Sequence, residues 1–208
     1  MRMSCIRHWH RFFQFRFPPY NRIDTMAQNN LDTQQLHKEI HEAYKARLEE
    51  LEKEDGDDDE QEEPYERSLL HNAIYLHRMW FEQQDGGSDD SNSSPLLDDI
   101  LGRRESDLST FKNWMNDFAE TARPNGWAIW GWAHSLKTFV GFPLRGHDES
   151  VPLGVSPLLV IDCWEHAWIA DFELDFEAYL NQFWQNINWD VIEQRHHELA
   201  QMFGFGVK

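Results

Sequence analysis

Three histidines and one aspartate stand at positions from which their side chains could bind one metal ion. Asp162 and His166 lie four residues apart, where an apolar stretch ends and WEHAW begins, so a helical turn there would bring carboxylate and imidazole together. His37 and His77 fall on two predicted helices near the N-terminus. Three imidazoles and one carboxylate suit Fe or Mn, with Zn competing on affinity. Because the chain has 11 histidines, the alternative is that some are hydrogen-bonded core residues placed on helices by chance.

The composition describes a globular chain with a strong acidic excess. The 208 residues include 19 Lys and Arg against 37 Asp and Glu, a formal net charge of -18. This charge argues against a protein that coats nucleic acid with its whole surface, although a local basic arm remains compatible with it. Two cysteines are too few for a disulfide framework and indicate a reducing compartment. No apolar run is long enough to suggest a membrane span, so we expect no membrane partner.

The charge is unevenly placed, which predicts four parts of the chain. Residues 1–23 carry five arginines and no acid, typical of a mitochondrial presequence or of a basic arm that is retained. Residues 49–66 carry twelve acids and one lysine, which predicts an acidic loop inside a helical hairpin domain over residues 31–84. Residues 85–95 have the composition of a linker, and residues 96–208 would form the C-terminal domain.

The first half of the chain shows helical spacing of apolar residues. This spacing predicts helices over residues 31–51 and 68–83, a short helical turn over 96–100, and a third amphipathic helix from residue 108 to about residue 123. His37 and His77 would therefore lie on the two helices of one hairpin.

The pattern of residue types changes after residue 125. Aromatic and β-branched residues with Gly punctuation over 126–142 predict a hairpin of two strands, and residues 157–162 predict a third strand. Residues 172–203 return to helix, with a break around Asn188 and Trp189. We therefore expect an α+β fold, with an N-terminal helical hairpin followed by an α/β domain that contains a small three-stranded antiparallel sheet.

Several motifs resemble those of the iron/manganese superoxide dismutases. The stretches PLLVIDCWEHAW and EAYLNQFWQNINWDVIEQR are similar to the C-terminal signature of that family, and NGWAIWGW and LSTFKNWMNDFAETA resemble the segments before it. The resemblance covers roughly residues 31–197. It implies that a metal ion lies between the helical hairpin and the α/β domain.

The resemblance also implies roles for individual residues. Asp162 and His166 match the two C-terminal ligands, and His77 matches a ligand on the second helix. Glu165 matches an acid that reaches the partner's ligand histidine across a dimer interface, where His41 would also lie. Trp127 and Trp164 match aromatic residues that pack around the site.

The first helix departs from the family pattern by one residue. The family has a ligand histidine, two further histidines and a tyrosine that gates the substrate funnel, whereas QLHKEIHEAY is one residue shorter. Counting from the histidines makes His37 the ligand, whereas counting back from Tyr44 puts Leu36 at that position. Because one residue turns a helix by about 100°, ligand and gate would both be in place only if a helical bulge of the family is absent here.

Other positions depart further. The family glutamine that holds the metal-bound solvent comes from the second helix or the second strand, and the corresponding positions here, Ala73 and about Val140, cannot donate a hydrogen bond. Trp168 and Ile169 stand where the family has two tyrosines. These losses would detune a redox metal.

Two functions follow from this pattern. The departures and the basic arm favour a structural component of the small subunit of the mitochondrial ribosome, with lost or reduced catalysis, in the mitochondrial matrix. Its partners would be a paralogous chain in a pseudo-dimer and, through residues 1–23, ribosomal proteins and rRNA. The retained ligands favour the alternative, a homodimeric dismutase that uses Fe or Mn to convert superoxide to dioxygen and hydrogen peroxide.

Overall fold

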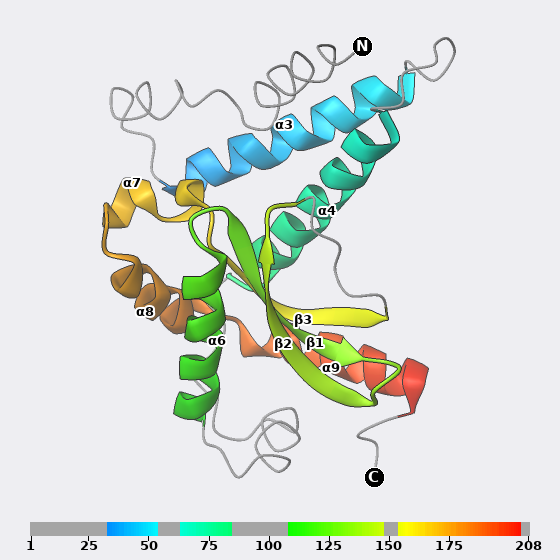
Figure 1. Ribbon diagram of the computed structural model, residues 1–208, viewed down its shortest axis with the longest axis vertical. Helices are drawn as coiled ribbons and strands as arrows, with labels where there is room; N and C mark the ends of the chain where they lie inside the picture. Colours follow the sequence, from blue (N-terminus) through cyan, green and yellow to red (C-terminus); the bar gives the residue numbers. More distant parts are fainter. Residues whose placement is uncertain (1–32, 54–62, 85–107, 148–153, 205–208) are drawn as a thin grey trace, which may run out of the picture.

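The chain begins, in its described part, with a helical hairpin. The computed structural model describes residues 33–53, 63–84, 108–147 and 154–204. Helices α3 (Thr33–Lys53) and α4 (Glu63–Glu82) pack against each other and diverge toward the rest of the molecule (Figure 1). Arg47 on α3 donates from Nε and Nη2 to the two carboxylate oxygens of Glu66 on α4, at 2.8 and 3.2 Å. This bidentate pair ties the two helices together near the acidic run.

The predicted acidic loop over residues 49–66 is too long, because helix covers both of its flanks. Helix α3 continues to Lys53, where Leu51 is buried and holds the last turn against the core. Helix α4 begins at Glu63, and Pro64 in its first turn is compatible with a helix start. Only residues 54–62 separate the helices, and they lie outside the described residues.

The second half contains a three-stranded antiparallel sheet with strand order β2-β1-β3. The strands are β1 (Gly126–Ala133), β2 (Thr138–Arg145) and β3 (Val155–Asp162). Strand β1 is buried along its whole length, because it has a strand on each side and helix α6 (Leu108–Ala122) packs against β1 and β2. Helices α4 and α9 (Trp189–Phe203) pack against β3. The predicted three-stranded sheet and α+β class are confirmed.

Short helices connect β3 to α9. A 3-10 turn, η1 (Glu165–Ala167), follows β3 and is succeeded by α7 (Ile169–Phe172) and α8 (Phe176–Asn186). Asn188 caps α9 by accepting a hydrogen bond from the Asp190 backbone N–H at 3.1 Å, which explains the predicted break before Trp189. The predicted arm 1–23, linker 85–95 and helical turn 96–100 lie outside the described residues.

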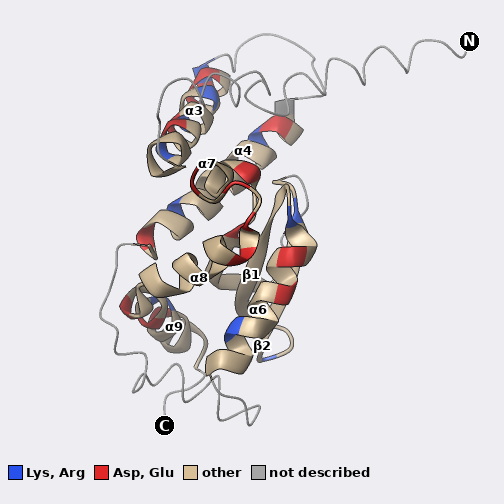
Figure 2. Cartoon of the chain, turned by 90° about the vertical axis from the view of Figure 1, so that its left-hand side faces the viewer, with Lys and Arg blue, Asp and Glu red and all other residues tan. Residues whose placement is uncertain are grey.

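Charges of both signs are distributed over the described helices. Figure 2 shows Lys and Arg beside Asp and Glu on α3 and α6. Several charged residues pair three positions apart in sequence, such as Lys45 with Glu42 at 3.0 Å and Arg123 with Glu120 at 2.6 Å. None of the helices within the described ranges combines the length and the low polarity that a membrane span requires.

Gly131 is a position at which the sheet tolerates no side chain. The pairing of β1 with β3 shifts register between Trp130 and Gly131. A Cβ atom on Gly131 would lie 2.4 Å from the Ser156 carbonyl oxygen and 3.0 Å from the Pro157 Cα. Both neighbours are backbone atoms, so the strands would have to separate to admit a methyl group.

We therefore expect Gly131→Ala to lower the free energy of unfolding by about 1–3 kcal/mol, the usual cost of overpacking a core. Chemical denaturation followed by circular dichroism measures the effect. The control is Ser135→Ala in the exposed turn between β1 and β2, which should change stability by less than about 0.5 kcal/mol. Equal stability of the two variants would contradict the close approach at Gly131.

Candidate metal centre

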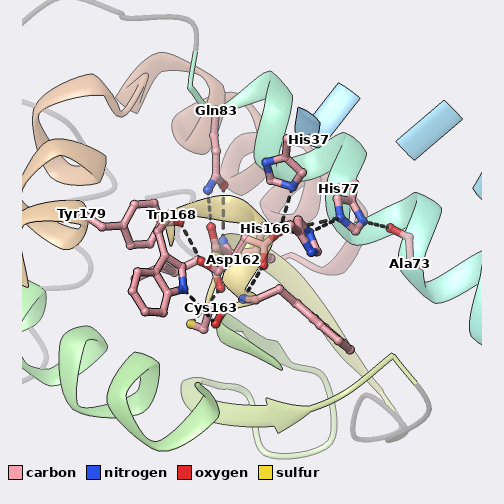
Figure 3. A network of polar contacts seen from close by, with 12 residues as sticks. His37, Ala73, His77, Gln83, Asp162, Cys163, His166, Trp168 and Tyr179 are labelled. Atoms are coloured by element: carbon pink, nitrogen blue, oxygen red, sulfur yellow. Dashed lines mark hydrogen bonds and ion pairs between the residues drawn. The ribbon is translucent and has the colours of Figure 1, made fainter. Parts of the chain in front are cut away.

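Four side chains from four elements meet at the junction of the hairpin and the sheet. They are His37 on α3, His77 on α4, Asp162 at the end of β3 and His166 in η1, and one ligand atom from each lies within 4.8 Å of all the others (Figure 3). Asp162 Oδ2 is 2.8 Å from His37 Nε2, 3.7 Å from His77 Nε2 and 3.5 Å from His166 Nε2. The structure thus brings together the four side chains that the sequence predicts as metal ligands.

The turn after β3 fixes the orientation of the Asp162 carboxylate. The Trp164 backbone N–H donates to Asp162 Oδ1 at 2.9 Å, which leaves Oδ2 to face the three histidines. The Tyr179 hydroxyl donates to the Asp162 backbone carbonyl at 2.7 Å and holds the strand end against α8. These two contacts use the groups of Asp162 that face away from the cluster.

A backbone carbonyl orients His77. Its Nδ1 lies 2.7 Å from the carbonyl oxygen of Ala73, one turn earlier on α4. Because a carbonyl oxygen only accepts, Nδ1 carries the proton and Nε2 presents its lone pair toward His166 Nε2, 3.3 Å away. This is the usual arrangement of an imidazole that binds a metal ion through one nitrogen.

His37 and Tyr44 both face the site, although the spacing between histidine and tyrosine on α3 is one residue shorter than in the family pattern. Helix α3 is continuous from Thr33 to Lys53. Seven residues turn an α-helix by about 700°, within about 20° of two full turns, so His37 and Tyr44 share one face. The Tyr44 ring lies 5.6 Å from the His77 ring. His37, rather than Leu36, therefore contacts Asp162, and an unbulged helix accommodates the shorter sequence.

Burial sets the protonation of the cluster. Desolvation lowers the pKa of His37 despite the opposing effect of Asp162, and it lowers the pKa of His77 further. Burial acts to raise the pKa of Asp162, but the nearby His166 and His37 outweigh it and hold that pKa well below its usual range. At neutral pH the site thus contains a carboxylate and at least two neutral imidazoles, which are the protonation states that metal binding requires.

The buried polar atoms fit a metal ion. His37 Nε2 and Asp162 Oδ2 are inaccessible to solvent and, although 2.8 Å apart, do not form a well-aligned hydrogen bond. Leaving such atoms unsatisfied is costly, and an ion between them would satisfy both. Zn²⁺, an ion of the same row as Fe and Mn, holds N and O ligands at about 2.0–2.2 Å, so ligands on opposite sides of an ion lie about 4 Å apart. The three separations from Asp162 Oδ2 to the histidine nitrogens, 2.8, 3.7 and 3.5 Å, lie within that limit.

A further histidine beside the cluster was missed from the sequence. Ala73 and Val140 carry no polar side chain, as expected, and Val140 pairs with Gly131 within the sheet. The polar side chain near His77 is instead that of His147, two residues after the end of β2, which is buried with its ring 5.5 Å from that of His77. Its ring stacks on Trp164 at 4.7 Å and 10°. The expectation for Ala73 and Val140 thus holds, and the segment after β2 supplies a polar side chain that was not predicted from the sequence.

Aromatic residues surround the ligands. The Trp127 ring lies edge-on to His77 at 5.0 Å, and the Trp164 ring stacks near His166 at 6.0 Å. Trp168 is buried and its indole N–H donates to the Cys163 carbonyl at 3.4 Å, so it braces the turn and supplies no hydroxyl group. The rings of Trp127 and Trp164 thus lie beside two of the cluster histidines.

Glu165 and His41 lie at the margin of the cluster. Both are partly exposed, and the His41 ring is 5.9 Å from the His77 ring. Partial burial lowers the pKa of His41. Because the structure describes a single chain, the placement of these residues at a dimer interface stays a prediction.

The chain is similar to superoxide dismutases in sequence. It is 28% identical to manganese superoxide dismutase 2 of Halobacterium salinarum over 140 residues, which is 65% of this chain and 67% of that relative. Manganese superoxide dismutase of Haloarcula marismortui is 25% identical over 139 residues, 65% of this chain and 66% of the relative. That of Mycobacterium lepraemurium is 28% identical over 123 residues, 58% of each chain.

The chain thus spans between 58% and 67% of the length of these three relatives. Residues 93–195 match the family description of the C-terminal domain of iron/manganese superoxide dismutases, a range that contains Asp162 and His166. Together with the fold and the meeting of the four ligand-type side chains, these similarities show that the chain belongs to the iron/manganese superoxide dismutase family.

Proposed function

We propose that this chain is a dismutase that uses Fe or Mn to convert two superoxide anions and two protons to dioxygen and hydrogen peroxide. The observation that carries the proposal is the convergence of His37, His77, Asp162 and His166 in one buried cluster. Two of the three departures that argued for lost catalysis weigh less in this proposal. The continuous α3 puts His37 and Tyr44 on one face, and His147 supplies a polar side chain beside His77.

The ligand residues would hold the ion in a largely buried site, since three of the four side chains are buried and His166 is partly exposed. A bound Fe or Mn ion would supply the one-electron redox chemistry that dismutation of superoxide requires. Asp162 contributes the negative charge of the ligand set, and the three imidazoles contribute neutral nitrogen donors. The contact between His77 Nδ1 and the Ala73 carbonyl keeps His77 Nε2 directed at the cluster.

Formation of hydrogen peroxide requires protons, and Tyr44 is placed to hold one. Burial raises the pKa of Tyr44, so its phenol Oη stays protonated at neutral pH. Its ring lies 5.6 Å from both the His77 and the His147 rings. In this proposal Tyr44 donates a hydrogen bond into the substrate position, and His147 orients the solvent molecule beside it.

The assembly and compartment of the enzyme are part of the proposal. Glu165 and His41, partly exposed beside the cluster, would contact a second copy in a homodimer. The basic, acid-free residues 1–23 would direct the chain to the mitochondrial matrix.

A structural role in the small subunit of the mitochondrial ribosome is the second candidate. Trp168 favours it, because an indole that braces the turn replaces a tyrosine hydroxyl. On this proposal, residues 1–23 would contact rRNA and ribosomal proteins, and a paralogous chain would form a pseudo-dimer.

The first test is metal content and superoxide dismutation on the same purified sample. We expect one Fe or Mn ion per chain, with turnover. Asp162→Asn keeps the size of the side chain but removes its charge, and should lower the affinity for the ion by more than about 100-fold, since even groups that only support ligands contribute 10–100-fold. The charge-matched control, Asp171→Asn at an exposed position, should keep both ion and activity.

A folded wild-type protein without bound ion or turnover would contradict the dismutase proposal. Sedimentation of that protein with small ribosomal subunits would then support the second candidate.

His147 is tested by a pair of substitutions. His147→Leu removes the nitrogen atoms beside His77 and should lower turnover by about 10–100-fold while the ion is retained. His147→Gln keeps a polar side chain and should retain most of the activity. Metal content and turnover of both variants provide the comparison. Equal turnover of the Leu and Gln variants would rule out a role for the polar atoms of His147.

The buried histidines predict how stability depends on pH in the metal-free protein. The pKa values of His37 and His77 are lowered from 6.5 in the folded state, so the unfolded chain binds protons first as the pH falls. Their contribution to stability is present above pH 6.5 and is lost below it, by about 1.4 kcal/mol per pH unit for each histidine. Denaturant titrations at a series of pH values measure this slope. His77→Gln should reduce it by about one proton, and an unchanged slope would contradict the burial of a neutral His77.

A further inference from the structure

The outer edge of β3 is covered by side chains instead of by a fourth strand. Strand β3 lies at one edge of the sheet, because the strand order is β2-β1-β3. Backbone groups of alternate residues point away from β1 along this edge, at Leu158, Val160 and Asp162. The three are bound by polar side chains of Arg195 on α9, of Gln83 just after α4 and of Tyr179 on α8. The last of them is the carboxylate residue of the metal centre.

Gln83, just after the end of α4, binds the middle of this edge. Its Oε1 accepts from the Val160 backbone N–H at 3.3 Å, and its Nε2 donates to the Val160 carbonyl (Figure 3). The side-chain amide thus reproduces the pairing of a neighbouring strand. The Gln83 backbone carbonyl accepts from the Asn188 N–H at 2.8 Å, at the start of α9. Gln83 is fully buried, so water does not compete for these contacts.

Arg195 on α9 joins the same edge to the last turn of α4. Its Nη1 donates to the Leu158 carbonyl at 2.8 Å and to Gln83 Oε1 at 3.2 Å. Its Nη2 donates to the Met79 carbonyl at 2.9 Å and pairs with Glu82 Oε2 at 2.9 Å. One planar guanidinium group therefore contacts β3 and α4 at once, which a lysine with a single donor atom could not do.

We propose that Gln83 and Arg195 are positioning residues that set the register of α4 along β3 and thereby place His77 against Asp162 and His166. The proposal rests on the proposed metal centre. Neither residue touches the cluster. Gln83 lies six residues after His77, directly beyond the end of α4, and Val160 precedes Asp162 by two on β3. The hydrogen bonds of Gln83 and Arg195, which we call the clamp, therefore fix both elements close to their ligands.

Metal binding requires precise ligand positions, so the position of α4 along β3 must be fixed closely. A helix advances about 1.5 Å per residue, whereas metal–ligand distances are held to within about 0.2 Å. A slide of α4 by a small fraction of one residue would therefore spoil the His77 position. Apolar packing between α4 and β3 resists separation, but directional hydrogen bonds to fixed backbone groups resist sliding.

The test uses Co²⁺ as a probe on the metal-free full-length chain, because its visible spectrum reports ligand geometry independently of activity. Gln83→Met keeps the length of the side chain and removes the amide. We expect it to weaken Co²⁺ binding by about tenfold or more and to shift the absorption bands. Arg195→Lys retains the positive charge near Glu82 and should shift the spectrum in the same direction, which keeps the proposal testable if Gln83→Met fails to fold.

The matched control is Asn116→Leu. It removes another hydrogen bond between elements, from Trp184 Nε1 to Asn116 Oδ1 at 2.8 Å, which joins α8 to α6 away from the cluster. It should lower thermal stability but leave Co²⁺ affinity and spectrum unchanged.

Three outcomes would contradict parts of this account. Wild-type affinity and spectrum in both clamp variants would overturn the positioning role and leave the metal centre intact. Equal spectral changes in Asn116→Leu would show that general destabilisation is responsible, and would also overturn it. Failure of the wild-type chain to bind Co²⁺ would overturn the metal centre itself, and the positioning role with it.

Discussion

A buried carboxylate among buried imidazoles is the constraint around which the molecule is organised. Asp162 is fully buried, and its charge faces histidines and no Lys or Arg within the described residues. Burying a charge is unfavourable unless hydrogen bonds or an ion compensate for it. The backbone N–H of Trp164 satisfies one oxygen, and the second oxygen is left for the cluster. The local structure therefore directs the remaining negative charge toward a single point between the two halves of the chain.

The strands and helices around that point hold the cluster residues in place. Strand β1 is buried on both faces and carries Trp127 next to His77, while β3 carries the carboxylate at its end. The hairpin contributes His37 from α3 and His77 from α4. A regular α3 is sufficient to place both His37 and Tyr44 at the site, because these residues are two helical turns apart. Side chains of Gln83, Tyr179 and Arg195 form hydrogen bonds with the outer edge of β3. Asp162 and His77 are thus held by hydrogen bonds on the side opposite the cluster.

Much of this arrangement could be predicted from the sequence, since apolar periodicity located the helices and the aromatic run located the sheet. The four residues of the cluster were also identified. The end of β2 was not, because Pro143 reads as a strand breaker. In the structure Pro143 pairs with Ala128 in an edge strand, where a missing N–H is tolerated. His147, two residues beyond the end of β2, was not recognised as part of the site. The side chains that cover β3 could not be predicted either, because their partners are backbone groups without a sequence signature.

The distribution of the four cluster residues over the chain has a consequence for how an ion would enter. His37 and His77 belong to the hairpin, whereas Asp162 and His166 belong to the other half, and three of the four are completely buried. Exchange of a bound ion would therefore be slow while the hairpin and the sheet stay packed and faster when they separate. The identity of the ion would then be decided by which metal is abundant while the two halves close, because intrinsic affinities alone favour other first-row metals over Fe and Mn.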